Sequence, residues 1–157
     1  MIYFYSENNK NAEIISREIE GGLKMVASSC ETKQTKNFEE ATETDTLIIC
    51  IAKKTIGSQL PIADKIKAKT LYLAGAGLNL KEIEEITRQL RERGLNVNNS
   101  ICLRRKALIA GIMEDNLKEE ELARAKAFGE RIGLQMTGQR AKQWNEKNRI
   151  KNYSTSH

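Results

Sequence analysis

Short apolar runs alternate with segments of helical periodicity along this chain. Runs rich in β-branched and aromatic residues predict strands at positions 2–5, 46–51, 70–74 and 95–103, and a weaker run predicts another at 25–27. The run at 46–51 is the most continuous, which is typical of a central parallel strand covered on both faces. The apolar pattern therefore predicts a largely buried sheet.

Polar residues with capping ability mark the first and last predicted helices. Asn11 can cap a helix over residues 12–20, and the glycine pair at 21–22 predicts its end. Asn116, with Glu119 three residues later, predicts the start of the last helix. The apolar face expected for that helix consists of Leu122, Ala125, Gly129 and Ile132, flanked by Phe128.

The clearest helical pattern lies in the middle of the chain. It begins at Asn79, where Glu82 completes a plausible capping box, and Gly94 predicts its end. The stretch from 28 to 45 is polar and allows at most a short helix near Phe38, and another short helix is expected through residues 62–66. Each of these helical segments follows a predicted strand.

Strands and helices alternate with short connections, which implies right-handed crossovers between parallel strands. The predicted fold class is therefore α/β, a three-layer sandwich in which helices cover both faces of a five-stranded parallel sheet. We assign residues 1–134 to this domain and residues 135–157 to a basic C-terminal tail. No internal repeat interrupts this pattern.

The composition restricts the chemistry that such a domain can perform. Isolated cysteines, three in number, and a single histidine at the last position argue against a disulfide framework, a metal site and a histidine-dependent nucleophile. We expect Cys50 and Cys102 to be buried structural thiols. No apolar run approaches the roughly 20 residues that span a bilayer, and the N-terminus lacks the pattern of a secretion signal. We therefore expect a cytoplasmic protein without membrane contact.

Positive charge gathers at the C-terminal end. The chain carries a net charge of +5, and most of this excess lies beyond position 136. A basic tail can contact nucleic acid or an acidic partner, and it is also what a solvated chain end often looks like. The basic residues there are Arg140, Lys142, Lys147, Arg149 and Lys151, against the single acid Glu146.

The loop between the first strand and the first helix is the first candidate for chemistry. Backbone N–H groups at a helix start attract phosphate, and the helix dipole favours a negative charge. Serine and asparagine side chains add hydrogen-bonding groups, and a lysine adds a cation. The candidate phosphate-binding residues are Ser6, Asn8, Asn9, Lys10 and Asn11.

Further loops follow the third, fourth and fifth strands, and all should meet at the carboxyl edge of the sheet, where open α/β sheets bind ligands. The candidates after the third strand are Lys53, Lys54, Thr55, Ile56 and Gly57. Those after the fourth strand are Gly75, Ala76 and Gly77. Cations after the fifth strand, at positions 104–106, would join the same rim and favour an anionic ligand.

Together these loops make the chain resemble the flavodoxin family. Residues 6–11 resemble the family's phosphate loop, S-x-T-G-N-T, although the glycine and both threonines are replaced. Residues 53–61 are similar to its first ring-binding loop, including the spacing of Gly57 and Pro61, and residues 74–77 resemble the second. The resemblance covers roughly residues 1–134 and implies the strand order 2-1-3-4-5.

The resemblance also implies a function. It predicts that the loops named above bind flavin mononucleotide (FMN), and that the protein is an electron carrier or a small flavin-dependent oxidoreductase without a catalytic side chain of its own. Its partner would be a redox protein or a small-molecule acceptor. The alternative is a flavodoxin-like binding module without flavin, which holds another anionic ligand or a protein partner, because neither ring-binding loop contains a Trp or Tyr to stack on the ring.

Overall fold

The computed structural model describes residues 1–52, 64–107 and 113–155. Within these ranges a five-stranded sheet forms the centre of the fold, and every neighbouring pair of strands is parallel. Its order is β2-β1-β3-β4-β5, as predicted. The strands are β1 (Ile2–Ser6), β2 (Thr32–Thr35), β3 (Thr46–Ala52), β4 (Thr70–Ala76) and β5 (Val97–Leu103).

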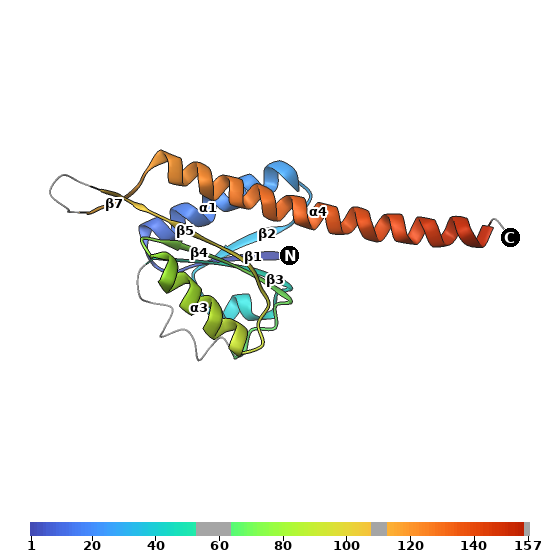
Figure 1. Cartoon of the computed structure of the whole chain (residues 1–157), viewed down its shortest axis with the longest axis horizontal. Coiled ribbons are helices and arrows are strands. Elements are labelled where there is room, and N and C mark those ends of the chain that lie inside the picture. The colour runs from blue at the N-terminus through green and yellow to red at the C-terminus, as the bar shows by residue number, and fades with distance from the viewer. Residues whose placement is uncertain (53–63, 108–112, 156–157) are drawn as a thin grey trace.

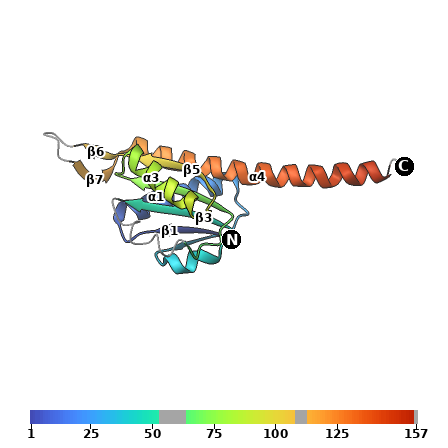
Figure 2. The ribbon, with the colours of Figure 1, turned by 60° about the horizontal axis from the view of Figure 1, so that its bottom comes forward.

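Helices cover both faces of this sheet, which confirms the three-layer architecture (Figures 1 and 2). On one face, α1 (Lys10–Val26) and α4 (Glu119–Thr155) pack over a core that includes Phe4, Ile48 and Phe128. The other face is covered by α3 (Leu80–Glu92) and by η1 (Phe38–Glu43), a 3₁₀ helix in the stretch where the sequence allowed at most a short helix. The strands β3 and β4, buried on both faces, separate these two cores.

The prediction for the second strand is wrong. Residues 25–26 belong to α1, which continues through the glycines at 21–22, and the strand beside β1 is β2 instead. The glycine at position 22 serves packing and not a helix end, since an added Cβ there would lie 2.0 Å from the Lys126 carbonyl oxygen of α4. The hydrophobic pattern does not reveal the strand β2, because β2 lies at the edge of the sheet and its residues are polar.

The prediction for the middle helix is confirmed in detail. The side chain of Asn79 accepts a hydrogen bond from the Glu82 N–H, and the Glu82 carboxylate accepts one from the Asn79 N–H. Beyond α3, Gly94 has φ = 84°, a left-handed conformation that favours glycine. Of the expected helix through residues 62–66, positions 62 and 63 lie outside the described residues, and residues 64–66 are not helical.

The last helix begins later than the sequence suggested. Asn116 belongs to a strand, β7, so it does not cap α4, which starts at Glu119. An antiparallel hairpin of β6 (Arg105–Ala107) and β7 (Met113–Leu117) separates β5 from α4. The predicted apolar face of α4 is largely confirmed, since Ala125, Gly129 and Ile132 are buried, as is the flanking Phe128, while Leu122 is only partly buried.

The helix α4 is 37 residues long, about 55 Å at 1.5 Å per residue, and its C-terminal half projects beyond the rest of the molecule (Figure 1). The segment that the sequence marks as a basic tail thus continues this helix as far as Thr155. Among the described helices, none combines the length and the apolar character needed to cross a membrane.

Candidate functional site

The strand order places the candidate site at the carboxyl ends of β1 and β3. The chain leaves β1 towards β2 on one side and returns to β3 on the other, so the connections diverge between β1 and β3. In open α/β sheets, this switch point is where ligands bind. Ser6, the last residue of β1, pairs in register with Cys50 of β3.

The loop after β1 forms a capped helix start. The Asn9 side-chain oxygen accepts hydrogen bonds from the backbone N–H groups of Asn11 (2.9 Å) and Ala12 (3.3 Å), so Asn9 is the N-cap of α1. Asn8 and Lys10 are exposed, whereas Ser6 and Asn11 are buried. The structure thus brings all the predicted loop residues together at the positive end of the α1 dipole.

Glu7 is a site residue that the sequence analysis missed. The residue is 7% exposed, and its carboxylate accepts a hydrogen bond from the backbone N–H of Ala52 at the end of β3. The Glu7 N–H donates to the Cys50 carbonyl oxygen at 3.2 Å, so main chain and side chain together continue the β1–β3 contact beyond the last ladder pair. Burial raises the pKa of this carboxyl, and the hydrogen bond from Ala52 opposes that rise.

The residues predicted after β4 occupy different environments. Gly75 lies within β4, where an added Cβ would meet Ile83 Cδ1 at 2.5 Å and Leu78 Cδ1 at 2.9 Å. Ala76 is also in β4 and is buried. Gly77 lies beyond the strand with φ = 75°, and its N–H donates to the Leu103 carbonyl oxygen at 2.8 Å. Packing under α3 accounts for Gly75, and a role for this loop beside a ligand stays a prediction.

The other predicted rim residues are less completely described. The candidates after β3 (Lys53, Lys54, Thr55, Ile56 and Gly57) lie outside the described residues. Arg104 is exposed after β5, and its N–H donates to the Glu121 carboxylate at 2.7 Å. Arg105 and Lys106 fall on β6, in the hairpin that follows.

The surroundings of Cys50 and Cys102 do not activate either thiol as a nucleophile. Cys50 is fully buried and beside Ser16, and burial raises its pKa to about 12, so it stays protonated at neutral pH. Cys102 is half-buried, with a raised pKa for the same reason. Over residues 1–52, 64–107 and 113–155, no cluster of His, Cys, Asp and Glu side chains could hold a metal ion.

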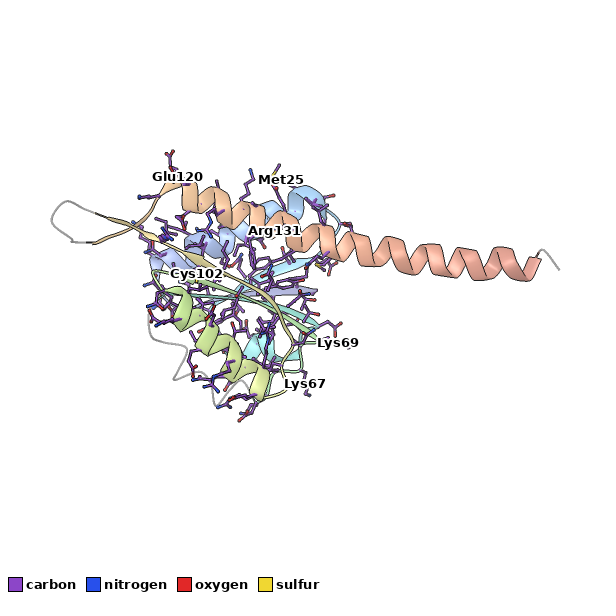
Figure 3. The ribbon with its side chains drawn as sticks, viewed as in Figure 1. Met25, Lys67, Lys69, Cys102, Glu120 and Arg131 are labelled. Carbon is purple, nitrogen blue, oxygen red and sulfur yellow. The ribbon has the colours of Figure 1, made fainter. Side chains whose placement is uncertain are left out.

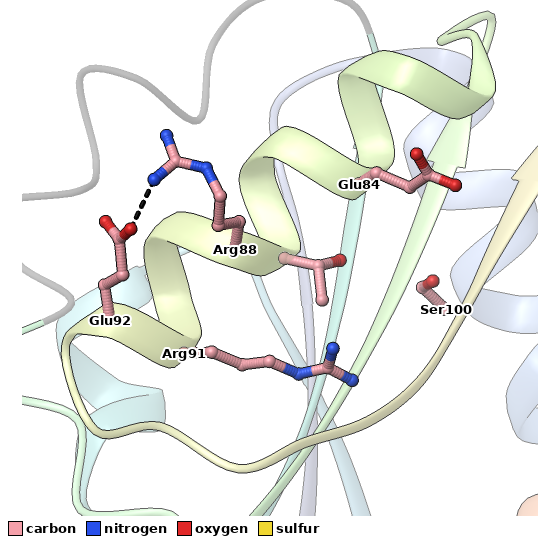
Figure 4. Close-up of a pocket in the computed structure, with 6 residues that line it drawn as sticks. Glu84, Arg88, Arg91, Glu92 and Ser100 are labelled. Carbon is pink, nitrogen blue, oxygen red and sulfur yellow. Dashed lines mark hydrogen bonds and ion pairs between the residues drawn. The ribbon is translucent and has the colours of Figure 1, made fainter.

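Two hollows lie near the described surface of the sheet. One of about 140 Å³ lies between β1, β2 and α1, and Ser6 forms part of its wall. The other, of about 480 Å³, lies between α3 and β5 (Figure 4). The Arg88 guanidinium in this second hollow pairs with Glu85 and Glu92, and Arg91 donates to the carbonyl oxygen of Val97, at the start of β5. The larger hollow therefore extends away from the carboxyl edge.

No protein-family model matches the sequence, and no curated protein matches it either. Solved structures do match its fold. A flavodoxin from Megasphaera elsdenii has a TM-score of 0.61 at 16% sequence identity, with 83% of this chain and 96% of that chain covered. A diflavin flavoprotein A3 from Nostoc sp. has a TM-score of 0.58 at 12% identity, with 91% and 96% covered.

An NAD(P)H:quinone oxidoreductase from Methanothermobacter marburgensis has a TM-score of 0.50 at 10% identity, with 83% of this chain and 93% of that chain covered. The matches span almost the full length of these proteins, while sequence identity stays low. Likeness of this kind reports the arrangement of the backbone and not the ligand. Together with the strand order β2-β1-β3-β4-β5, it shows that this chain has a flavodoxin-like fold.

Proposed function

We propose that this chain is an FMN-binding flavodoxin-like protein that transfers electrons to a redox partner protein or a small-molecule acceptor. The observation that carries the proposal is the loop between β1 and α1, which lies at the switch point of a flavodoxin-like sheet. It combines a helix start, the Lys10 cation and the hydroxyl of Ser6, a residue that is 4% exposed.

The described residues fit the phosphate group of FMN on one side of this loop and not on the other. The positive end of α1, Lys10 and the Ser6 hydroxyl favour an anion. On the β3 side, the Glu7 carboxylate takes the N–H of Ala52 and would repel a phosphate. Asn9 takes two further N–H groups of the helix start. The phosphate therefore fits on the Ser6 side.

The remaining loops would hold the ring. We propose this role for Gly77 and for the residues of the 53–57 loop, as the resemblance implies. A bound flavin supplies one- or two-electron transfer, and the protein then contributes binding and orientation. No proton-transferring side chain is required for such a function, which agrees with a composition that contains one histidine.

The absorption spectrum of protein purified from a flavin-replete culture tests this proposal. We expect the flavin bands, or quenching of free FMN fluorescence when colourless protein is titrated with it. Lys10→Gln should weaken FMN binding by about two- to fivefold, the scale of one partly exposed charge. Lys69→Gln should not, because this exposed lysine directly precedes β4, at the opposite edge of the sheet. Colourless protein that leaves FMN fluorescence unchanged would refute flavin binding.

A second candidate is a binding module without flavin, and the contact between Glu7 and Ala52 favours it. This carboxylate uses a backbone donor at the switch point that a ligand could otherwise receive. Thermal-shift measurements against phosphorylated metabolites separate the two candidates. Stabilisation by a phosphorylated compound other than FMN would support the module, and no stabilisation by any of them would leave only a protein partner.

A further inference from the structure

The C-terminal half of α4 extends away from the candidate site. The helix begins beyond the carboxyl end of β5 and runs back along the sheet, so its second half projects past the opposite edge (Figures 1 and 2). Met136 still packs against the core, and residues 139–155 continue the helix for about 25 Å at 1.5 Å per residue. Flavin binding at the carboxyl edge does not account for this extension.

Positive charge is concentrated on the projecting segment. Residues 139–157 contain five basic residues and one acid, so they carry +4 of the net charge of +5. Residues 1–138 are therefore nearly neutral. A local excess of this kind attracts a polyanion, because each cation in contact with it releases counterions.

The basic residues form two rows along the helix. Residues that lie three, four or seven positions apart share one face of an α-helix. Arg140, Lys147 and Lys151 form the first row, and Lys142 and Arg149 form the second. At about 100° per residue, the two rows lie on opposite sides of the helix.

A row of asparagines lies between the two basic rows. Asn145, Asn148 and Asn152 follow one another at intervals of three and four residues, so they share a face as well. The same count of about 100° per residue places Glu146 on the other side of the helix. The segment therefore carries a row of hydrogen-bonding residues with cations on both sides of it.

The apolar residues of the segment do not form a stripe. Ala141 and Trp144 lie on one side of the helix, and Ile150 and Tyr153 lie on the opposite side. A coiled coil requires a continuous apolar seam, and a helix that lies on a membrane requires an apolar face. The pattern favours neither a second copy of the helix nor a lipid surface.

Duplex DNA is complementary to this arrangement. Its major groove is about 12 Å wide and admits an α-helix, and asparagine can form two hydrogen bonds with an adenine edge there. The corresponding groove of duplex RNA is too narrow for side chains to read. The stretch from position 140 to position 151 rises about 17 Å, which equals about five base pairs at 3.4 Å each.

We propose that the projecting half of α4, residues 139–155, binds duplex DNA in the major groove. The asparagine row faces the base edges, and the two basic rows contact the phosphates of the two strands. This interaction surface is independent of the proposed function, because it lies away from the carboxyl edge of the sheet.

Fluorescence anisotropy of a labelled 20-base-pair duplex of mixed sequence, titrated with the full chain, tests the proposal. The logarithm of the affinity should fall with the logarithm of the salt concentration with a slope of about −4 to −5, close to one unit for each basic residue in contact. Lys147→Gln should make this slope shallower by about one unit and weaken binding about three- to tenfold. Arg131→Gln is the matched control and should change neither, because this exposed arginine lies on the half of α4 that packs on the domain (Figure 3).

Two further measurements test where and how the helix binds. An A·T duplex should bind more tightly than a G·C duplex of equal length, and Asn148→Ala should reduce this preference without changing the salt slope, because it removes no charge. Trp144 is the single tryptophan of the chain, so its emission should change over the same range of DNA concentration. Far-UV circular dichroism checks that the variants keep the helix.

Several outcomes would overturn the proposal. DNA binding that Lys147→Gln leaves unchanged, or that does not alter the Trp144 emission, assigns the contact to another surface. Equal weakening of both duplexes by Asn148→Ala overturns the placement of the asparagines at the bases. Absence of DNA binding overturns the whole proposal, and binding to phosphatidylserine vesicles instead would assign the helix to a membrane surface. These measurements need no flavin, so failure of FMN binding leaves them unaffected.

Discussion

Glu7 shows how one side chain can divide a binding edge in two. Its carboxylate accepts the Ala52 N–H and so occupies the space between β1 and β3 at the switch point. Ser6, its neighbour in sequence, lies on the face of the sheet opposite Tyr5. It lines a hollow on the β2 side of β1, which stays open. An acid directly after a buried strand was visible in the sequence. Its role depends on where β3 ends, which no local pattern reveals.

Glu7→Gln should change the dependence of stability on pH. Burial raises the pKa of Glu7 in the folded state, so the proton is bound more tightly there than in the unfolded chain. The stabilisation from this proton is present below the unfolded-state pKa and is lost as the pH rises through the folded-state pKa. Urea unfolding should therefore show Glu7→Gln gaining stability over the wild type between about pH 4 and pH 7.5.

An exposed glutamate provides the control for this experiment. Glu31→Gln should change stability little at either pH, since the side chain is solvated in both states. A Glu7→Gln protein that is less stable than the wild type at neutral pH would contradict the prediction. It would show that the bond from the Ala52 N–H to a full carboxylate outweighs the cost of burying the charge.

At the scale of elements, close contact between α1 and α4 determines how the two helices pack in the layer that covers one face of the sheet. Gly22 on α1 meets the backbone of α4 near Lys126, and Gly129 on α4 meets the Ile19 carbonyl, where an added Cβ would lie 2.0 Å away. The glycine that a local reading takes as a helix stop is thus a packing residue. The same distinction explains Gly75, which the side chains of Leu78 and of Ile83 on α3 require to be small.

The adjacent glycines of α1 should therefore respond oppositely to alanine. Gly22→Ala places a methyl group against the backbone of α4 and should destabilise the fold by about 1–3 kcal/mol. Gly21→Ala meets nothing within 4 Å and should stabilise it by about 0.5–1 kcal/mol, because alanine is the better helix former. Equilibrium denaturation measures both, and equal effects of the two substitutions would contradict the close packing of α1 on α4.

The edge strand β2 illustrates a limit of hydrophobic patterns. Three of its four residues are not buried, and among the described strands it pairs only with β1. Residues 25–27 are more apolar than β2, but they lie at the end of α1 and pack towards α4 instead of forming a strand. Ala27 is buried, and a Cβ added at Gly133 of α4 would lie 3.1 Å from the Val26 Cβ. A polar segment becomes a strand here because a neighbour supplies its hydrogen-bonding partners.

At the scale of the whole molecule, α4 packs on the domain with its N-terminal half, and its basic C-terminal half projects beyond the domain (Figure 1). Its described contacts with the core include Gln135, which accepts a hydrogen bond from the Tyr72 hydroxyl at 2.8 Å, and Met136, which packs against the core. Thr137 donates to the Gly133 carbonyl oxygen at 3.0 Å within the helix. The domain can therefore be separated near Gly138 without removing these contacts.

Truncation after Gly138 should leave the domain folded, with an unfolding free energy within about 0.5 kcal/mol of the full chain. Any affinity of the full chain for nucleic acid should fall steeply with salt and be lost on truncation, because the removed segment holds the basic residues from Arg140 to Lys151. Binding measured by fluorescence anisotropy in two salt concentrations checks this. Affinity that survives the truncation unchanged would assign the contact to another surface.

The sequence by itself determined the α/β alternation, the buried strands β3 and β4, and the caps at Asn79 and Gly94, because apolar period and capping are interactions between near neighbours in the chain. The tertiary structure alone decided that Gly22 admits α4, that residues 32–35 form a strand, and that Glu7 closes one side of the switch point while Ser6 faces the other. Each of these depends on groups distant in sequence that meet only in the folded chain.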